Sequence, residues 1–231
     1  MSPQRAKAAS SRSAATGVRL HRPTQLLFIP FCLTALAATI FGRAKGRGGA
    51  PVDWLIVGLG NPGARYAETR HNVGYMVAER LIERYQLGKT KSKYRGRIVD
   101  GRLGPGGPRV AVLMPDTFMN ESGKSAGPAR GELRVDPDHV VVIHDEIDFS
   151  FGRIETRLGG GAAGHNGLKS LKNGFGTADF LRVRVGVGRP EGTDPELVSA
   201  WVLGRFAESK DEVDELVDQA LDATVQLIEH G

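Results

Sequence analysis

The sequence predicts an α/β fold, a single domain in which helices flank a twisted, mixed β-sheet. Three apolar runs alternate along the chain with amphipathic segments of helical period. Such runs, rich in β-branched residues, are typical of strands that are buried on both faces. Shorter stretches in which polar and apolar residues alternate add further strands, and they indicate that the sheet is not purely parallel.

The predicted elements follow one another in chain order. Buried strands are expected at 54–59, 109–114 and 139–144, and alternating strands at 97–102, 153–158 and 180–188. Helices are expected where apolar residues recur at helical spacing. One apolar stripe lies in 70–85 and a second in 208–229, the first formed by Val73, Met76, Val77, Leu81 and Ile82. The domain is therefore expected to span residues 53–231.

Composition excludes several classes of protein. Of the 231 residues, 40% are hydrophobic and 25% are charged, which is ordinary usage for a globular domain. The single cysteine, Cys32, cannot form an internal disulfide, which excludes a secreted fold built on disulfides. There is also no cysteine pair to bind zinc. The net charge is +5, and the first 52 residues carry eight Lys and Arg without any acidic residue.

Residues 1–52 are expected to be separate from the domain. Within them, 26–41 is an almost wholly apolar run of sixteen residues that Pro30 interrupts. This run is shorter than the roughly 20 residues that a membrane-spanning helix needs. Three interpretations stay open: an unstructured extension or a start assigned too early, a targeting segment, and a membrane anchor.

Polar residues follow the three buried strands. The first is followed by GLGNPGARYAETRHN, the second by PDTFMNESG and the third by Asp145 with its neighbours, while the glycine-rich stretch 158–169 opens onto His165. In open α/β sheets, ligands bind beyond the carboxyl ends of the strands. We therefore expect one crevice to gather a histidine, a carboxylate and three amides, namely His71, Asp145, Asn61, Asn120 and Asn166.

Each motif has an alternative interpretation. Gly58, Gly60 and Gly63 fit the G-x-G-x-x-G pattern of dinucleotide-binding turns, but Pro62 delays the helix and the expected acidic residue is missing. The run His144, Asp145, Glu146 and Asp148 could bind a metal. His71 could lie on the surface or cap a helix, and Asn120 could likewise be a helix cap.

The motifs together, in this order, resemble those of the bacterial peptidyl-tRNA hydrolase family. The matching strings are VGLGNPGARYAETRHNVG, FMNESGK, HDEID, GGGAAGHNGLKS and RVRVGVGRP, and the likeness covers 53–231. It implies a monomeric, cytoplasmic enzyme that hydrolyses the ester between a peptide and the 3′ end of tRNA. It also implies that peptidyl-tRNA is the partner, that no protein partner is obligatory, and that no metal or cofactor is used.

The resemblance also implies a role for individual residues. The catalytic base falls on His71 and its supporting carboxylate on Asp145. The amides that hold the substrate fall on Asn61, Asn120 and Asn166, with Asn61 distinguishing N-blocked from free aminoacyl-tRNA. Tyr66 and Phe118 would contact the acceptor end, and Arg157 and Arg184 would contact phosphate. Departures from the family pattern at Ala162, Ala163 and Arg157 are expected to be tolerated. The lack of a basic tail after the acidic helix and the 52-residue front extension, which has no family counterpart, bear on tRNA affinity and localisation more than on chemistry.

The chemistry can be argued from the residues themselves. A neutral histidine can deprotonate a positioned water that attacks an ester, without a covalent intermediate. If Thr69 caps the following helix, the helix N-terminus would favour the neutral form of His71, while Asp145 would fix its tautomer and stabilise the cation. Two other classes remain: an RNA-binding protein without catalysis, and a metal-dependent hydrolase that uses His144, Asp145 and Asp148.

Two sets of cations could contact nucleic acid. Lys89, Lys91, Lys93, Arg95 and Arg97 recur at every second residue and are expected to share one side of an extended segment. A second set, which includes Arg157 and Arg184, flanks the glycine loop. The alternative is a solvated face for the first set and, for the two arginines, pairing with Glu155 or Asp179 at the sheet edge.

Overall fold

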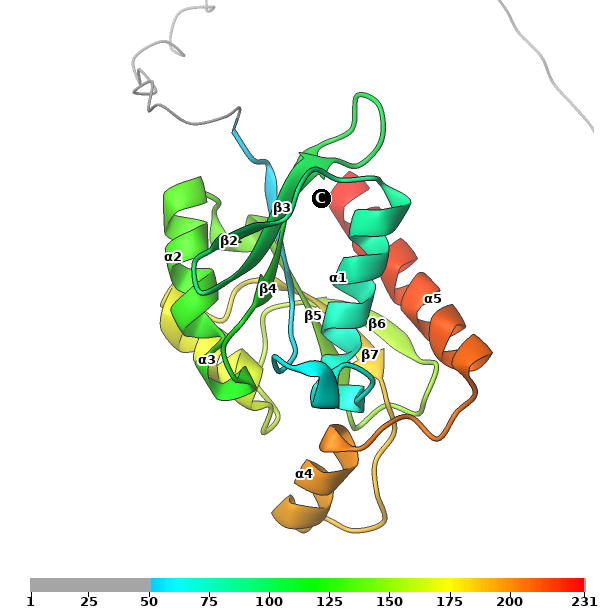
Figure 1. The fold of residues 1–231 in the computed structure, drawn as a ribbon. Coiled ribbons are helices and arrows are strands. Elements are labelled where there is room, and N and C mark those ends of the chain that lie inside the picture. The colour runs from blue at the N-terminus through cyan, green and yellow to red at the C-terminus, as the bar shows by residue number, and fades with distance from the viewer. Residues whose placement is uncertain (1–50, 231) are drawn as a thin grey trace, which may run out of the picture. The chain divides into compact units, whose positions relative to one another are not determined.

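The computed structural model describes residues 51–230, so the expectations for the apolar run 26–41 lie outside the described residues. A seven-stranded sheet with the order β2-β3-β4-β1-β5-β7-β6 forms the centre of the domain (Figure 1). The strands are β1 Trp54–Gly58, β2 Lys91–Lys93, β3 Gly96–Arg102, β4 Arg109–Pro115, β5 Val140–Glu146, β6 Ile154–Leu158 and β7 Leu181–Gly186.

The sheet is mixed, as predicted. The four central strands β4, β1, β5 and β7 are parallel, whereas β2 and β3 at one edge and β6 at the other pair antiparallel. All six predicted strands are present, and each begins and ends within two residues of its predicted bounds. The predicted α/β fold class is therefore confirmed.

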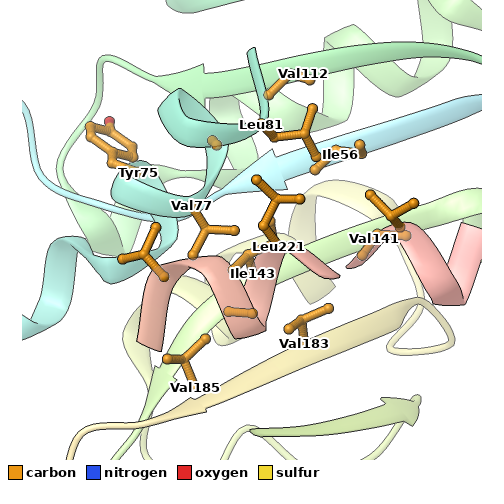
Figure 2. Close-up of a cluster of buried hydrophobic side chains, with 14 of the residues drawn as sticks. Ile56, Tyr75, Val77, Leu81, Val112, Val141, Ile143, Val183, Val185 and Leu221 are labelled. Carbon is orange, nitrogen blue, oxygen red and sulfur yellow. The ribbon is translucent and has the colours of Figure 1, made fainter. Parts of the chain in front are cut away.

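Helices cover both faces of the sheet (Figure 1). Helices α1 (Val73–Arg84) and α5 (Lys210–Glu229) pack on one face, and α2 (Gly123–Leu133) and α3 (Asn166–Phe175) pack on the other. Figure 2 shows the hydrophobic core between the sheet and helices α1 and α5. There, Val77 and Leu81 of α1 and Leu221 of α5 pack against strand residues such as Ile56 and Ile143. The amphipathic stripes at 70–85 and 208–229 are the faces that this packing buries.

The apolar pattern did not predict four elements: β2, α2, α3 and the short helix α4 (Pro195–Leu203). Helix α2 buries Gly123, Ser125, Ala126 and Ala129, and these small residues leave no apolar stripe to detect. Small residues are needed here because the backbones of α2 and α3 lie in contact. A Cβ atom added to Gly123 would lie 2.0 Å from the Ser170 carbonyl oxygen.

The basic segment 89–97 folds differently from its prediction. It is a β-hairpin that turns at Tyr94 and Arg95, whose φ angles are 57° and 53°. Because Ser92 pairs with Arg97 across the hairpin, Arg97 faces the side opposite to Lys91 and Lys93. The expectation of a single cationic side is therefore wrong. Lys91 and Lys93 also form ion pairs with Asp100 at 2.6 Å and Glu132 at 2.5 Å.

The topology places the ends of β1 and β5 at the switch point of the sheet. The chain leaves β1 through α1 on one face, and it reaches β5 through α2 on the opposite face. Such a point opens a crevice beyond the carboxyl ends of the two strands. Among the described residues, no helix is both long enough and apolar enough to cross a membrane.

Candidate active site

A cavity of about 1010 Å³ opens beyond the carboxyl ends of β1, β4 and β5. Its wall includes all five residues that were expected to converge: Asn61, His71, Asn120, Asp145 and Asn166. Phe118, Arg157 and Arg184 also line it. Tyr66 does not; it lies half-buried in the short turn Ala64–Tyr66 after β1. The topology thus brings the five expected residues together from four separate segments of the chain.

His71 occupies a 3₁₀ turn, Arg70–Asn72, that leads directly into α1. Its Nδ1 donates a hydrogen bond to Asp145 Oδ1 at 2.8 Å. The side chain of Thr69 accepts no hydrogen bond from this turn, so the cap that the sequence argument assumed is not formed. Its hydroxyl instead donates to the Tyr66 carbonyl at 2.8 Å. Nδ1 is committed to the carboxylate, so Nε2 is the ring nitrogen that can accept a proton.

The charges of this pair oppose the effect of burial. Burial lowers the pKa of His71, but the charge of Asp145 and the hydrogen bond to it outweigh burial and raise that pKa above 6.5. Burial would raise the pKa of Asp145, yet His71 and His165 hold it well below 3.8. At His71 the influence of the carboxylate therefore exceeds that of burial.

His165 is a second histidine that contacts the Asp145 carboxylate. The sequence pattern assigned no role to His165. Its Nε2 lies 3.0 Å from Asp145 Oδ1. Its Nδ1 accepts the backbone N–H groups of Gly167 at 3.0 Å and Leu168 at 3.3 Å, which caps α3. An accepting Nδ1 carries no proton, so Nε2 holds the proton of the ring and donates it to Asp145.

The Nε2–H tautomer of His165 determines how well His71, Asp145 and His165 could bind a metal ion. The ligand atoms of His71, Asp145 and His165 lie within 4.8 Å of one another, and no other group of this kind is found in residues 51–230. A metal on His165 Nε2 would require an imidazolate, because Nδ1 is already occupied by two backbone donors. The cluster therefore fits a hydrogen-bonded network better than a metal site.

The alternative metal site at His144, Asp145 and Asp148 is not assembled. Asp148 is exposed and pairs with Arg189 at 2.9 Å. The Nδ1 of His144 donates to the backbone carbonyl of Asp145 at 2.7 Å. Burial, together with the neighbouring His165, lowers the pKa of His144 to about 3, so this fully buried ring is neutral at physiological pH.

Asn61 is held in one orientation by its surroundings. Asn72 binds its backbone twice, through Asn61 N–H at 2.8 Å and Asn61 C=O at 3.0 Å. The side-chain Oδ1 of Asn61 accepts the backbone N–H of Met119 at 2.8 Å. The Nδ2 group is therefore the part of the amide that can donate to a ligand in the cavity. Asn72 and Met119 are supporting residues that no sequence motif singled out.

The other amides lie at the beginnings of helical segments. Asn120 belongs to the turn Met119–Glu121, which precedes α2, and Asn166 is the first residue of α3. Both side chains are exposed on the cavity wall, and the ring of Phe118 next to them is 52% exposed. An exposed ring beside exposed amides is suited to stacking and hydrogen bonding with a nucleobase.

Arginines of β6 and β7 have different environments. Arg182 is buried and donates to the carbonyls of Gly160 at 2.7 Å and Gly161 at 2.6 Å, so it anchors the glycine loop. Arg184 is held by Glu146 at 2.9 Å and by Glu155 at 2.6 Å. Arg157 is exposed on the cavity wall, and among residues 51–230 it has no ion pair.

Helix α4 forms the far wall of the cavity through Val198, Val202 and Leu203. Arg70, the neighbour of His71, connects this helix to the turn Arg70–Asn72. Its guanidinium lies 3.9 Å from the centre of the Trp201 ring and donates to the Arg205 carbonyl at 2.6 Å. The cavity wall and the histidine turn are thereby joined by one buried cation.

An oriented histidine–carboxylate pair, set among amide donors beyond the carboxyl ends of parallel strands, is an arrangement typical of hydrolases. Comparison with known proteins narrows the class. The model of the peptidyl-tRNA hydrolase family matches residues 55–231, and the chain belongs to that family.

Individual relatives agree with this assignment. The chain is 48% identical over 180 residues to a peptidyl-tRNA hydrolase of Pseudarthrobacter chlorophenolicus, a match that covers 77% of this chain and 90% of the relative. It is 49% identical over 180 residues to that of Mycolicibacterium smegmatis, covering 77% and 92%. The crystal structure of the Acinetobacter baumannii peptidyl-tRNA hydrolase superimposes with a TM-score of 0.67 at 36% identity, covering 78% of this chain and 91% of that one. The resemblance predicted from the motifs is confirmed.

Proposed function

We propose that the cavity hydrolyses the ester of peptidyl-tRNA, with His71 as the general base that activates water. The observation that carries this proposal is the 2.8 Å hydrogen bond from His71 Nδ1 to Asp145, because it leaves Nε2 as the proton acceptor. A positioned base of this kind contributes about 100- to 10,000-fold to a rate.

The reaction then proceeds through a tetrahedral intermediate. Nε2 of His71 takes a proton from water as the oxygen attacks the ester carbonyl. The resulting imidazolium, stabilised by Asp145, returns the proton to the ribose oxygen as the carbon–oxygen bond to the tRNA breaks. Amide donors on the cavity wall, such as Asn120 or Asn166, can stabilise the developing oxyanion without adding charge.

The acceptor end of the tRNA would lie along the exposed groups of the wall. Phe118 offers a stacking surface, and Asn120 and Asn166 offer hydrogen bonds. Arg157 offers a charge that no carboxylate of residues 51–230 pairs with. Tyr66 does not line the cavity, so only a part of the tRNA that extends outside the cavity could contact Tyr66.

The function is tested by incubating the protein with N-acetylaminoacyl-tRNA in the presence of EDTA. The expected result is release of the N-acetylamino acid and of tRNA with a free 3′ end. Binding without release would favour the non-catalytic RNA-binding alternative. Hydrolysis that EDTA abolishes and zinc restores would favour a metal-dependent enzyme.

Asn61 is expected to select for the blocked amino group. Its Nδ2 can donate to the carbonyl oxygen that N-acylation adds, whereas a free aminoacyl-tRNA presents an ammonium group instead. Replacing Asn61 by Asp removes the donor and adds an anion that attracts the ammonium. The rate ratio between N-acetylaminoacyl-tRNA and aminoacyl-tRNA should fall roughly tenfold, because a neutral hydrogen bond contributes about 1 kcal/mol and the added anion favours the ammonium. An unchanged ratio would assign the selection to another residue.

Replacing Arg157 by Ala is expected to affect tRNA binding, whereas replacing Arg184 by Ala is expected to affect stability. Loss of Arg157 should weaken tRNA binding and reduce the slope of log K against log salt by up to about 0.9, the value for one phosphate contact. Loss of Arg184 should instead lower the melting temperature, because Glu146 loses its partner in a partly buried site. Binding titrations at several salt concentrations and a melting curve for each variant test both. Equal slopes for Arg157→Ala and wild type would contradict the phosphate contact.

A further inference from the structure

Asp145 Oδ1 receives two imidazole donors, and the proposed reaction uses only one of them. His71 Nδ1 and His165 Nε2 approach this oxygen to 2.8 Å and 3.0 Å, and the centres of the two rings are 5.0 Å apart. The side chains of all three residues are at most 12% exposed. Two donors on one buried oxygen compete for the same negative charge.

We propose that His165 is a positioning residue: by sharing Asp145 Oδ1 with His71, it limits how strongly the carboxylate holds a proton on His71. The proposal rests on the proposed role of His71 as the base. A base that binds its proton too tightly is largely protonated at neutral pH and cannot accept one from water. The second donor keeps a larger fraction of His71 in the free-base form.

The backbone fixes His165 in the role of donor. Gly167 and Leu168 direct their N–H groups at Nδ1, so protonation of Nδ1 would cost both hydrogen bonds at the start of α3. His144 approaches His165 edge-on at 5.1 Å and is neutral, because burial lowers its pKa to about 3. The geometry therefore directs an N–H group of His165 at Asp145 Oδ1.

Other charges face the cavity but remain the same when His165 is replaced. They are Glu146 of β5, Arg157 of β6, Arg182 and Arg184 of β7, and Arg189 in the loop after β7. Arg182 is bonded to loop carbonyls, and Arg184 and Arg189 pair with carboxylates. A difference in the titration of His71 between variants at position 165 would thus report on the shared oxygen.

Two substitutions separate the two hydrogen-bonding functions of the ring. In His165→Asn, the amide oxygen can take the place of Nδ1 and cap α3, but the side chain is too short to reach Asp145. In His165→Gln, the amide nitrogen can reach Asp145, but the cap is lost. The first variant removes the donor and keeps the cap, and the second does the reverse.

The experiment is an NMR titration of His71 in wild type and in both variants, combined with the pH profile of kcat/KM for N-acetylaminoacyl-tRNA. We expect His165→Asn to raise the pKa of His71 by about half to one unit, the scale of one hydrogen bond to a carboxylate. His165→Gln should leave that pKa near the wild-type value and lower the melting temperature. No shift in His165→Asn, or equal shifts in both variants, would overturn the proposal.

Two further readouts keep the interpretations apart. Nitrogen NMR of the wild-type protein should show His165 as the Nε2–H tautomer at neutral pH, and the opposite tautomer would overturn the proposal without any variant. If the pKa of His71 shifts in His165→Asn but the acid limb of kcat/KM stays in place, His165 does act on His71, and the assignment of His71 as the base is what fails.

Discussion

His71→Ala should reduce kcat for N-acetylaminoacyl-tRNA by about 100- to 10,000-fold, the contribution of a positioned general base. The remaining rate would come from substrate orientation and from the amide donors, which the substitution leaves in place. Binding of the tRNA should persist, because Phe118, Asn120, Asn166 and Arg157 are separate parts of the cavity wall. Single-turnover kinetics at saturating enzyme measure the chemical step, and a filter-binding titration measures the affinity.

His230→Ala is the matched control for this prediction. His230 is an exposed histidine that follows α5 and does not line the cavity, so its replacement should leave kcat unchanged. A His71→Ala variant that turns over within threefold of wild type, while the control behaves as expected, would remove His71 from the reaction.

Asp145→Asn should reduce kcat/KM by at least roughly 10- to 100-fold, the range found for carboxylates that orient metal-bound histidines. The remaining activity should also respond differently to pH. Without the charge of Asp145, burial dominates and lowers the pKa of His71. Since the free base is the active form, the acid limb of the pH profile should move to lower pH. The measurement is kcat/KM between about pH 5 and pH 9.

Asp148→Asn provides the control for the carboxylate. Asp148 lies three residues further along the chain, is exposed and pairs with Arg189, so its loss should leave the profile in place. An acid limb that stays where it is in Asp145→Asn would mean that the titrating group is not His71. A large loss in Asp148→Asn would instead revive the metal site at His144, Asp145 and Asp148.

The sequence predicted those parts of the fold that bury large apolar side chains. The strand at 109–114 and the helix at 208–229 carry apolar patterns that burial alone explains. Helix α2 escaped prediction because it packs through glycine, alanine and serine, and such residues also occur in loops. The hairpin at Tyr94 and Arg95 escaped because two non-glycine residues adopt positive φ angles there.

The candidate site could be predicted where a side chain acts directly, but not where it acts through another group. His71, Asp145 and Asn61 follow predicted strands, so the rule about carboxyl ends placed them in one cavity. The functions of His165 and Asn72 depend on hydrogen bonds across the fold, to Asp145 and to the Asn61 backbone. Spacing along the chain contains no information about such contacts.

The most direct test combines one activity profile with one titration in wild-type protein. kcat/KM for N-acetylaminoacyl-tRNA is measured against pH in the presence of EDTA, and the pKa of His71 is measured by NMR in the free enzyme. If His71 is the base, the rate rises with pH through a single acid limb whose midpoint equals that pKa and lies above 6.5. A midpoint that differs from the titration of His71, or activity that EDTA abolishes, would contradict general-base hydrolysis by this histidine.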